Sequence, residues 1–420
     1  MKNSLKTFIA GLTILVAPVT ILAEAAFFES PASQREILLA QKEANSLILV
    51  DTSSSTSDLV QALQQSTLKY QRRYAAQLLG ERKEPGTAPY LVQALDDPED
   101  IVQKAAAEAL VNQRDKSIFP QLIDTLSAPR PSAREYSAYV LGKLANKGDT
   151  AAIQALETAA GDEKSNVRVE VIYALYEIGS PSSKGIFVNG LNDEEARIRS
   201  YCANALGSLK TAGAGAELSA ALDRETDESV RRTIISAMGK IGGSSSAKTL
   251  AQAVTNENAS LRGDIADALG EIKTPEAIRA LVELLADSNP TVRARAASAL
   301  ANARDPSSAG ALANALKDRS PLVRRAASRA LIYIADSTTI KELVDALGDS
   351  DSEVAENAKE ALIHVNDLNA VHSLIDALDS GNPNKQTRAL MVLEEITHRP
   401  YGSDVVKWVQ WYEENFKTSE

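Results

Sequence analysis

Apolar positions between residues 58 and 398 follow two alternating helical patterns. In the first pattern leucine, alanine and leucine stand at i, i+3 and i+4, as in Leu312, Ala315 and Leu316. This spacing puts all three side chains on one stripe of an α-helix. An acidic turn follows, often with a proline, which suits the first turn of the next helix. Each stretch of this kind therefore predicts one helix and the start of another.

The second pattern centres on a recurring arginine. The positions one before it and three, seven and ten after it are apolar, as in Val230, Ile234, Met238 and Ile241 around Arg231. We expect these four positions to be buried. A small residue also recurs eight positions after the arginine, which is expected where two helices approach closely. In five repeats it is glycine: Gly80, Gly142, Gly207, Gly239 and Gly270.

The two patterns together repeat every 31 to 34 residues. Equivalent positions are Arg72, Gln103, Arg134, Arg168, Arg199, Arg231, Arg262, Arg293, Arg324, Ala355 and Arg388. Self-similarity at such a period is typical of a solenoid, in which stacked neighbours bury the stripe that a lone helix pair leaves open. The sequence predicts an all-α fold, an α-solenoid of about eleven helix pairs with terminal caps.

The unit of Leu-x-x-Ala-Leu, an acidic turn and Val-Arg-x-x-Ala-Ala-x-Ala-Leu resembles the HEAT-like repeat, particularly the short form of phycobiliprotein lyases and many bacterial proteins. HEAT repeats typically pair the turn acid with the arginine six positions later. That spacing predicts a structural ladder of five pairs: Asp162 with Arg168, Asp193 with Arg199, Glu225 with Arg231, Asp287 with Arg293, and Asp318 with Arg324. It is altered at Asn256/Arg262, Asn382/Arg388 and Asp97/Gln103, and lost at Ala128/Arg134 and Asp349/Ala355. The resemblance predicts the fold and says little about activity.

Both ends of the array predict separate segments. Residues 26–57 form an N-terminal amphipathic segment with a Ser-rich linker, residues 58–399 the solenoid, and residues 400–420 a C-terminal capping helix. The last segment resembles one found in many exported bacterial HEAT-repeat proteins, through Thr397, Tyr401, Gly402, Asp404, Trp408 and Trp411, with His398 where glycine is usual. A ligand-stacking role for the two tryptophans is the alternative to a cap.

Residues 1–25 read as a cleaved signal peptide. Lys2 and Lys6 precede an apolar run that ends in the small-x-small pattern Ala23-Glu24-Ala25. A retained membrane anchor is the alternative, but the run is short for a span and Pro18 interrupts it. We expect an exported protein, periplasmic or extracellular, with no membrane span after cleavage.

Charge and composition exclude several functions. The formal net charge of −11 argues against nucleic acid as a partner. Cys202, the one cysteine, aligns with buried alanines and predicts packing, not a nucleophile. Asp349, Asp351, Glu353 and Glu360 have a calcium-loop spacing, but its sixth position is Val354, which the repeat places inside a helix. We therefore predict no metal site, no cofactor and no catalytic residue.

Surface side chains carry the remaining signal. Positions two, five and nine after each arginine lie opposite the core, on the face that HEAT arrays usually present as their concave side. We predict that this side binds a protein or peptide, through Tyr136, Tyr139, Tyr173, Tyr176, Tyr201, Asp264, Asp267, Glu271, Arg295 and Arg329. The alternatives are tyrosines that merely cover the helices, a lyase or chaperone-lyase acting on a cofactor-bearing protein, and a structural spacer.

Overall fold

The protein, as a computed structural model, is described for residues 49–416, and the chain divides into two compact units between Ile186 and Phe187. The predicted signal peptide and most of the N-terminal segment lie outside the described residues. The described part contains eleven helix pairs and a final helix, and no strand. The predicted all-α solenoid of eleven helix pairs is confirmed.

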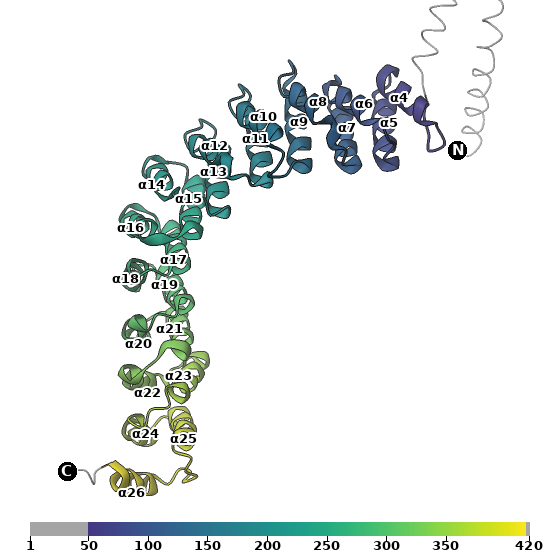
Figure 1. Ribbon diagram of the computed structural model, residues 1–420. Helices are drawn as coiled ribbons and strands as arrows, with labels where there is room; N and C mark the ends of the chain where they lie inside the picture. The colour runs from purple at the N-terminus through teal and green to yellow at the C-terminus, as the bar shows by residue number, and fades with distance from the viewer. Residues whose placement is uncertain (1–48, 417–420) are drawn as a thin grey trace, which may run out of the picture. The chain divides into compact units, whose positions relative to one another are not determined.

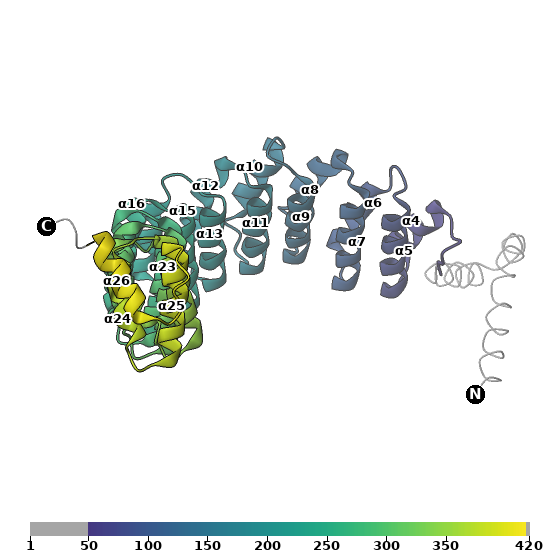
Figure 2. The same cartoon turned by 90° about the horizontal axis from the view of Figure 1, so that it is seen from below.

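Each pair consists of a first helix and a longer second helix. The first unit contains α4 (Thr56–Gln65), α5 (Lys69–Arg82), α6 (Ala88–Gln93), α7 (Asp100–Gln113), α8 (Phe119–Thr125), α9 (Pro131–Leu144), α10 (Thr150–Ala159) and α11 (Ser165–Ile178). The unit boundary falls within α12 (Lys184–Gly190). Within this unit the second helices α5, α7, α9 and α11 stand side by side, with the first helices along one side of them (Figures 1 and 2).

The second unit repeats this arrangement. It contains α13 (Ala196–Ser208), α14 (Gly215–Arg224), α15 (Glu228–Ile241), α16 (Gly243–Ala253), α17 (Ala259–Ile272), α18 (Pro275–Leu284), α19 (Pro290–Ala303), α20 (Ala309–Ala315), α21 (Pro321–Ile334), α22 (Ile340–Ala346), α23 (Ser352–Val365), α24 (Ala370–Leu378), α25 (Pro383–Thr397) and α26 (Val405–Phe416). Consecutive second helices pack on one another from α13 to α25 (Figure 1).

Local sequence fixes where the second helices begin and end. Helix α19 begins with Pro290, whose missing N–H costs nothing in the first turn, and the Asn289 side chain accepts a hydrogen bond from the Thr291 N–H. The same helix ends at Arg304, which adopts a left-handed conformation with φ of 55°. This pattern of ends keeps the second helices at similar lengths, so that their faces stay in register.

The buried face of the second helices is wider than the sequence predicts. Val230, Ile234 and Met238 of α15 are at most 2% exposed, as expected, whereas Ile241 at the end of the helix is only half-buried. Two more positions, four and six after the arginine, are also buried, as Ile235 and Ala237 are. They form the flank on which the neighbouring second helices α13 and α17 pack.

The recurring glycines lie where that flank comes closest to the preceding second helix. A Cβ placed on Gly207 of α13 would lie 2.6 Å from the Cα of Ala237 in α15. At Gly80, Gly142, Gly239 and Gly270 the nearest atom of the following second helix would lie between 2.6 and 3.0 Å away, and again belongs to an alanine. The predicted close approach at these positions is confirmed.

The C-terminal helix α26 packs against α24. The Trp408 side chain is fully buried, and its Nε1–H donates to the carbonyl oxygen of Gly402 at 2.8 Å. Its ring meets the edge of Tyr401 with centroids 4.9 Å apart. His398 takes the left-handed conformation, with φ of 54°, that glycine usually supplies at this position. The turn therefore forms without glycine.

Candidate interaction surface

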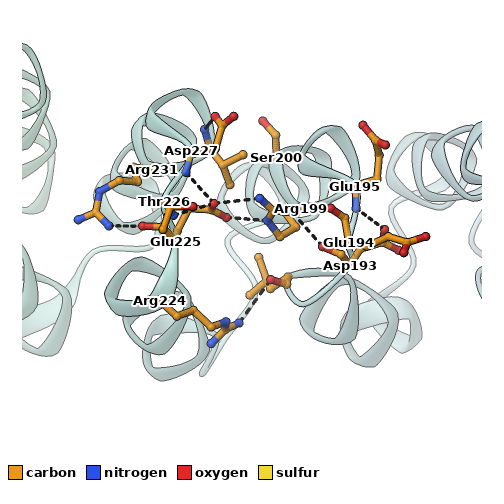
Figure 3. A network of polar contacts seen from close by, with 12 residues as sticks. Asp193, Glu194, Glu195, Arg199, Ser200, Arg224, Glu225, Thr226, Asp227 and Arg231 are labelled. Atoms are coloured by element: carbon orange, nitrogen blue, oxygen red, sulfur yellow. Dashed lines mark hydrogen bonds and ion pairs between the residues drawn. The ribbon is translucent and has the colours of Figure 1, made fainter.

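The recurring arginines connect consecutive repeats through both their side chains and the backbone. Figure 3 shows Arg199, whose Nε and Nη2 donate to the carboxylate of Glu225 at 2.6 and 2.9 Å. Its Nη1 donates to the backbone oxygens of Asp193 and Glu194 at 2.9 and 3.0 Å. The Arg199 guanidinium holds the pKa of Glu225 below its ordinary value. Arg199 thus binds both its own turn and the turn of the following repeat.

This geometry corrects the pairing that the spacing predicts. The acid six positions before each arginine does touch it, but through its backbone oxygen: Asp162 to Arg168, Asp193 to Arg199, Glu225 to Arg231, Asp287 to Arg293 and Asp318 to Arg324, at 2.6 to 3.1 Å. The carboxylates of Asp162, Glu225, Asp287 and Asp318 pair instead with the arginine of the preceding repeat. Ion pairs of this kind are Arg72 with Asp97, Arg134 with Asp162, Arg199 with Glu225, Arg231 with Glu257, Arg262 with Asp287, Arg293 with Asp318, and Arg324 with Asp349.

The corrected pairing explains positions that the spacing marks as lost. Arg134 has no acid six positions before it, yet it pairs with Asp162 of the next repeat at 2.6 Å. Arginine is missing at Ala355 and at Gln103, whose Nε2 donates to the backbone oxygen of Asp97 at 2.6 Å. Among the described residues, its buried Oε1 has no hydrogen-bond partner, and Ala128 stands where the next repeat would carry its acid.

In the first unit the second helices present tyrosine and carboxylate side chains around a surface hollow. The hollow has a volume of about 320 Å³ and is lined by Asp100, Lys104, Ala107, Glu108, Glu135, Tyr136, Tyr139 and Glu170. Tyr136 and Tyr139 are half-buried, and the Tyr136 hydroxyl donates to Asp100 Oδ1 at 3.0 Å. Burial and that hydrogen bond raise the pKa of Tyr136. The phenol therefore stays protonated.

A lysine lies between two tyrosines beside this hollow. The Lys143 Nζ of α9 lies 5.8 Å from the ring centroid of Tyr139 and 5.3 Å from that of Tyr173. It also donates to both carboxylate oxygens of Glu177 at 2.7 and 2.8 Å, which raises the pKa of Lys143. Tyr176, with its ring 6.5 Å from that of Tyr173, completes the aromatic side chains of α11. The structure thus places Tyr136, Tyr139, Tyr173 and Tyr176 on two adjacent helices.

Tyr201 belongs to the second unit, on α13. It is half-buried and helps to line a hollow of about 430 Å³ together with Arg197, Ser200 and Asp227. The Arg197 guanidinium lies 5.6 Å from its ring centroid. Tyr201 therefore has a site of its own, described within the second unit.

Three charged candidates of the second unit, Asp264, Asp267 and Arg295, form ion pairs with one another. Asp264 of α17 accepts from Arg232 at 2.9 Å and from Arg295 at 2.7 Å, and Asp267 pairs with Arg295 as well. A Cβ on Gly263 would lie 2.5 Å from Arg295 Nη1, so the glycine makes room for the guanidinium. These side chains link the three second helices α15, α17 and α19.

Two further candidates of this unit are more open to solvent. Glu271 is exposed on α17, at the edge of a hollow of about 290 Å³ that also contains Asp264, Asp267 and Arg295. Arg329 is exposed on α21 and pairs with Glu353. A partner that uses Arg329 has to compete with this pair, whereas Glu271 carries a charge at the open rim.

Three of the four carboxylates with calcium-loop spacing pair with arginines, and the fourth, Glu360, is exposed on α23. Asp349 pairs with Arg324, and Asp351 pairs with Arg325 at 2.7 Å. Val354 is buried inside α23, as the repeat predicts. Burial of Cys202 likewise raises the pKa of its thiol, and the side chain has no exposure. These residues serve the packing of the array.

A family model of HEAT repeats matches residues 56–127, 119–207, 185–264, 215–301, 248–318 and 309–394. The chain therefore belongs to the HEAT repeat family, and the resemblance seen in its repeat pattern is confirmed. No helix among residues 49–416 is both long enough and apolar enough to cross a bilayer.

Individual relatives share the architecture over different lengths. A HEAT repeat-containing taxis protein of Halobacterium salinarum is 30% identical over an alignment of 173 residues that covers 36% of this chain and 42% of that protein. Kap121p has 14% identity and a TM-score of 0.55 over 95% of this chain and 50% of its own. Kap95p has 15% identity and a TM-score of 0.52 over 95% of this chain and 62% of its own. At these identities the two solved structures show the fold alone.

The phycocyanin lyase subunits CpcE and CpcF of Nostoc sp. PCC7120 are also similar. Their complex matches with 23% identity and a TM-score of 0.32, over 55% of this chain and 93% of the matched chain. A similarity of that strength carries no argument about activity.

Proposed function

We propose that this protein is an exported, non-enzymatic scaffold that binds a protein or peptide through the exposed face of its second helices. The observation that carries the proposal is the hollow of about 320 Å³ in the first unit, bordered by the half-buried rings of Tyr136 and Tyr139. Tyrosine combines a large apolar ring with a hydroxyl, and such residues are enriched at protein interfaces. Repeat arrays of this class commonly use one long face for binding.

The central contact lies in the first unit. Tyr139 and Tyr173 occupy equivalent positions on the adjacent helices α9 and α11, and Tyr136 lies three residues before Tyr139 on α9. Tyr201 adds a second contact in its own hollow. Of the charged candidates, Glu271 and Arg329 supply the accessible charges, while Asp264, Asp267 and Arg295 first hold their helices together.

A site-specific crosslinking experiment tests this proposal. A photoreactive benzoylphenylalanine replaces Tyr139 on α9, and in a control chain it replaces Gln121, which is exposed on α8. In the compartment that the mature protein occupies, we expect a defined adduct from position 139 and none from position 121. Equal labelling at both positions, or none at either, supports a structural spacer instead.

Four further measurements complete the test. Changing Tyr136, Tyr139 and Tyr173 to serine should weaken capture at least tenfold, since buried aromatic anchors often dominate an interface. Melting of the variant reports whether the rings also support the fold. The mass of the mature chain should correspond to cleavage after Ala25. Transfer of a pigment to a carrier protein by the purified chain would contradict a non-enzymatic role.

A further inference from the structure

The hollow of the first unit has an uneven charge. Four carboxylates line it, Asp100, Glu108, Glu135 and Glu170, against the single ammonium of Lys104. Its aromatic border consists of Tyr136 and Tyr139, and the negative face of a tyrosine ring attracts cations within about 6 Å. An anionic partner group would meet repulsion here from both the carboxylates and the ring faces.

The same face already holds one ammonium group. Lys143 lies within 6 Å of the ring centroids of Tyr139 and Tyr173 and is bound by Glu177. The hollow offers groups of the same kinds, namely the rings of Tyr136 and Tyr139 and carboxylates from α7, α9 and α11. Lys143 is therefore an internal example of the ligand chemistry that these helices accommodate.

We propose that the hollow receives a lysine side chain of the partner, whose ammonium lies against Tyr136 and Tyr139 and pairs with Glu108. This inference rests on the proposed function, since it names the chemistry of the segment that the scaffold binds. Glu108 is exposed on α7, so that it can reach an incoming charge. A volume of about 320 Å³ lies at the lower end of the range for small-ligand sites, and suits one long side chain.

Lys104 provides a second test, because its charge should weaken the binding of a lysine side chain, whereas the charge of Glu108 should strengthen it. Its ammonium lines the same hollow from α7 and repels an incoming lysine. Removing this charge should strengthen binding, whereas removing the charge of Glu108 should weaken it. A site for an anionic or purely apolar group predicts the reverse order or no difference.

The test uses two synthetic peptides and the full mature chain. One peptide carries four lysines separated by Gly-Ser, and the other has the same sequence with every lysine acetylated. Affinities are measured by calorimetry at low and at physiological salt for the wild type, Glu108→Gln, Lys104→Ala and Asp124→Asn. Asp124 is an exposed acid on α8, outside the hollow, so its variant changes the net charge as Glu108→Gln does.

We expect the lysine peptide to bind at least tenfold more tightly than its acetylated form. Glu108→Gln should weaken it about threefold to tenfold, Lys104→Ala should tighten it by a similar factor, and Asp124→Asn should change it less than twofold. Equal weakening by Glu108→Gln and Asp124→Asn would overturn the proposal, because it would show attraction to the overall negative charge. Equal affinity for both peptides, with crosslinking at position 139 retained, would overturn the lysine site and leave the scaffold function standing. Loss of both signals would overturn both.

Discussion

Substituting Gly207 by alanine tests whether close helix approach, and not glycine's flexibility, sets the spacing of the array. The new Cβ would lie 2.6 Å from the Cα of Ala237, where ordinary carbon contacts need about 3.5 Å or more. The helices α13 and α15 must therefore separate by about 1 Å or bend. Alanine favours the helix by about 1 kcal/mol over glycine, but overpacking of this kind costs about 1–3 kcal/mol.

We expect the cost of overpacking to exceed the gain in helix propensity, because the nearest atom belongs to the backbone and cannot rotate away. The net loss should be up to about 2 kcal/mol of the free energy of unfolding. Urea denaturation followed by circular dichroism measures this loss. Hydrogen exchange of α13 and α15 should show that it is local, since each repeat contacts only its neighbours.

Two comparisons separate the possible causes. Gly310→Ala in α20 places its Cβ where no atom lies within 4 Å, so it should stabilise the chain by up to about 0.5–1 kcal/mol. The change Ala299→Gly should partly rescue Gly270→Ala, because there the nearest atom is the Ala299 Cβ at 2.8 Å. If Gly207→Ala is as stable as Gly310→Ala, the close approach does not explain the glycines.

Three other perturbations have expected outcomes. Asp162→Asn leaves the largely buried Arg134 without its charge partner and should destabilise the first unit by up to about 3–5 kcal/mol, with strong coupling in a double-mutant cycle against Arg134→Met in urea melts. The hydrogen bonds from Arg293 lower the pKa of Asp318 from the ordinary 3.8. The stabilising contribution of Asp318 is therefore present above that pH and is lost as the pH falls through the lower pKa of the folded state. Urea midpoints measured from pH 6 to 3 should fall less steeply in Asp318→Asn than in the wild type. Deleting residues 405–420 removes the buried Trp408, and hydrogen exchange should rise most in the last repeats and fade toward the first unit; uniform loss would contradict a stepwise array.

The fold could be predicted because the same pattern of buried apolar positions recurs in eleven successive repeats. Each second helix repeats apolar residues at the positions that its own partner helix covers, so Val230, Ile234 and Met238 stand out in sequence. The side of each second helix that packs on the neighbouring second helix is harder to recognise in the sequence. Ala237 is a small residue among many alanines, and its burial depends on a helix 31 residues away.

The candidate surface could be predicted in part. Helical spacing predicts which side chains share a face, and the structure has Tyr136 and Tyr139 on α9 and Tyr173 on the adjacent α11. The hollow itself also needs Glu108 and Glu170 from neighbouring helices, and their convergence depends on how the helices stack. For the same reason the spacing of acid and arginine could not show which of two adjacent turns the guanidinium reaches.

The offset pairing of arginine and acid also bears on how such a protein changes length. In every complete repeat the arginine pairs with the acid of the next repeat, and the acid pairs with the arginine of the previous repeat. Arg293 with Asp318 and Arg324 with Asp349 are two consecutive pairs of this kind. Excising the 31 residues 294–324 would bring Asp349 to the sequence distance from Arg293 that Asp318 now has. Deletion or duplication of one whole repeat therefore leaves no buried arginine or acid without its partner. The array can grow or shrink by recombination while each new junction remains electrically balanced.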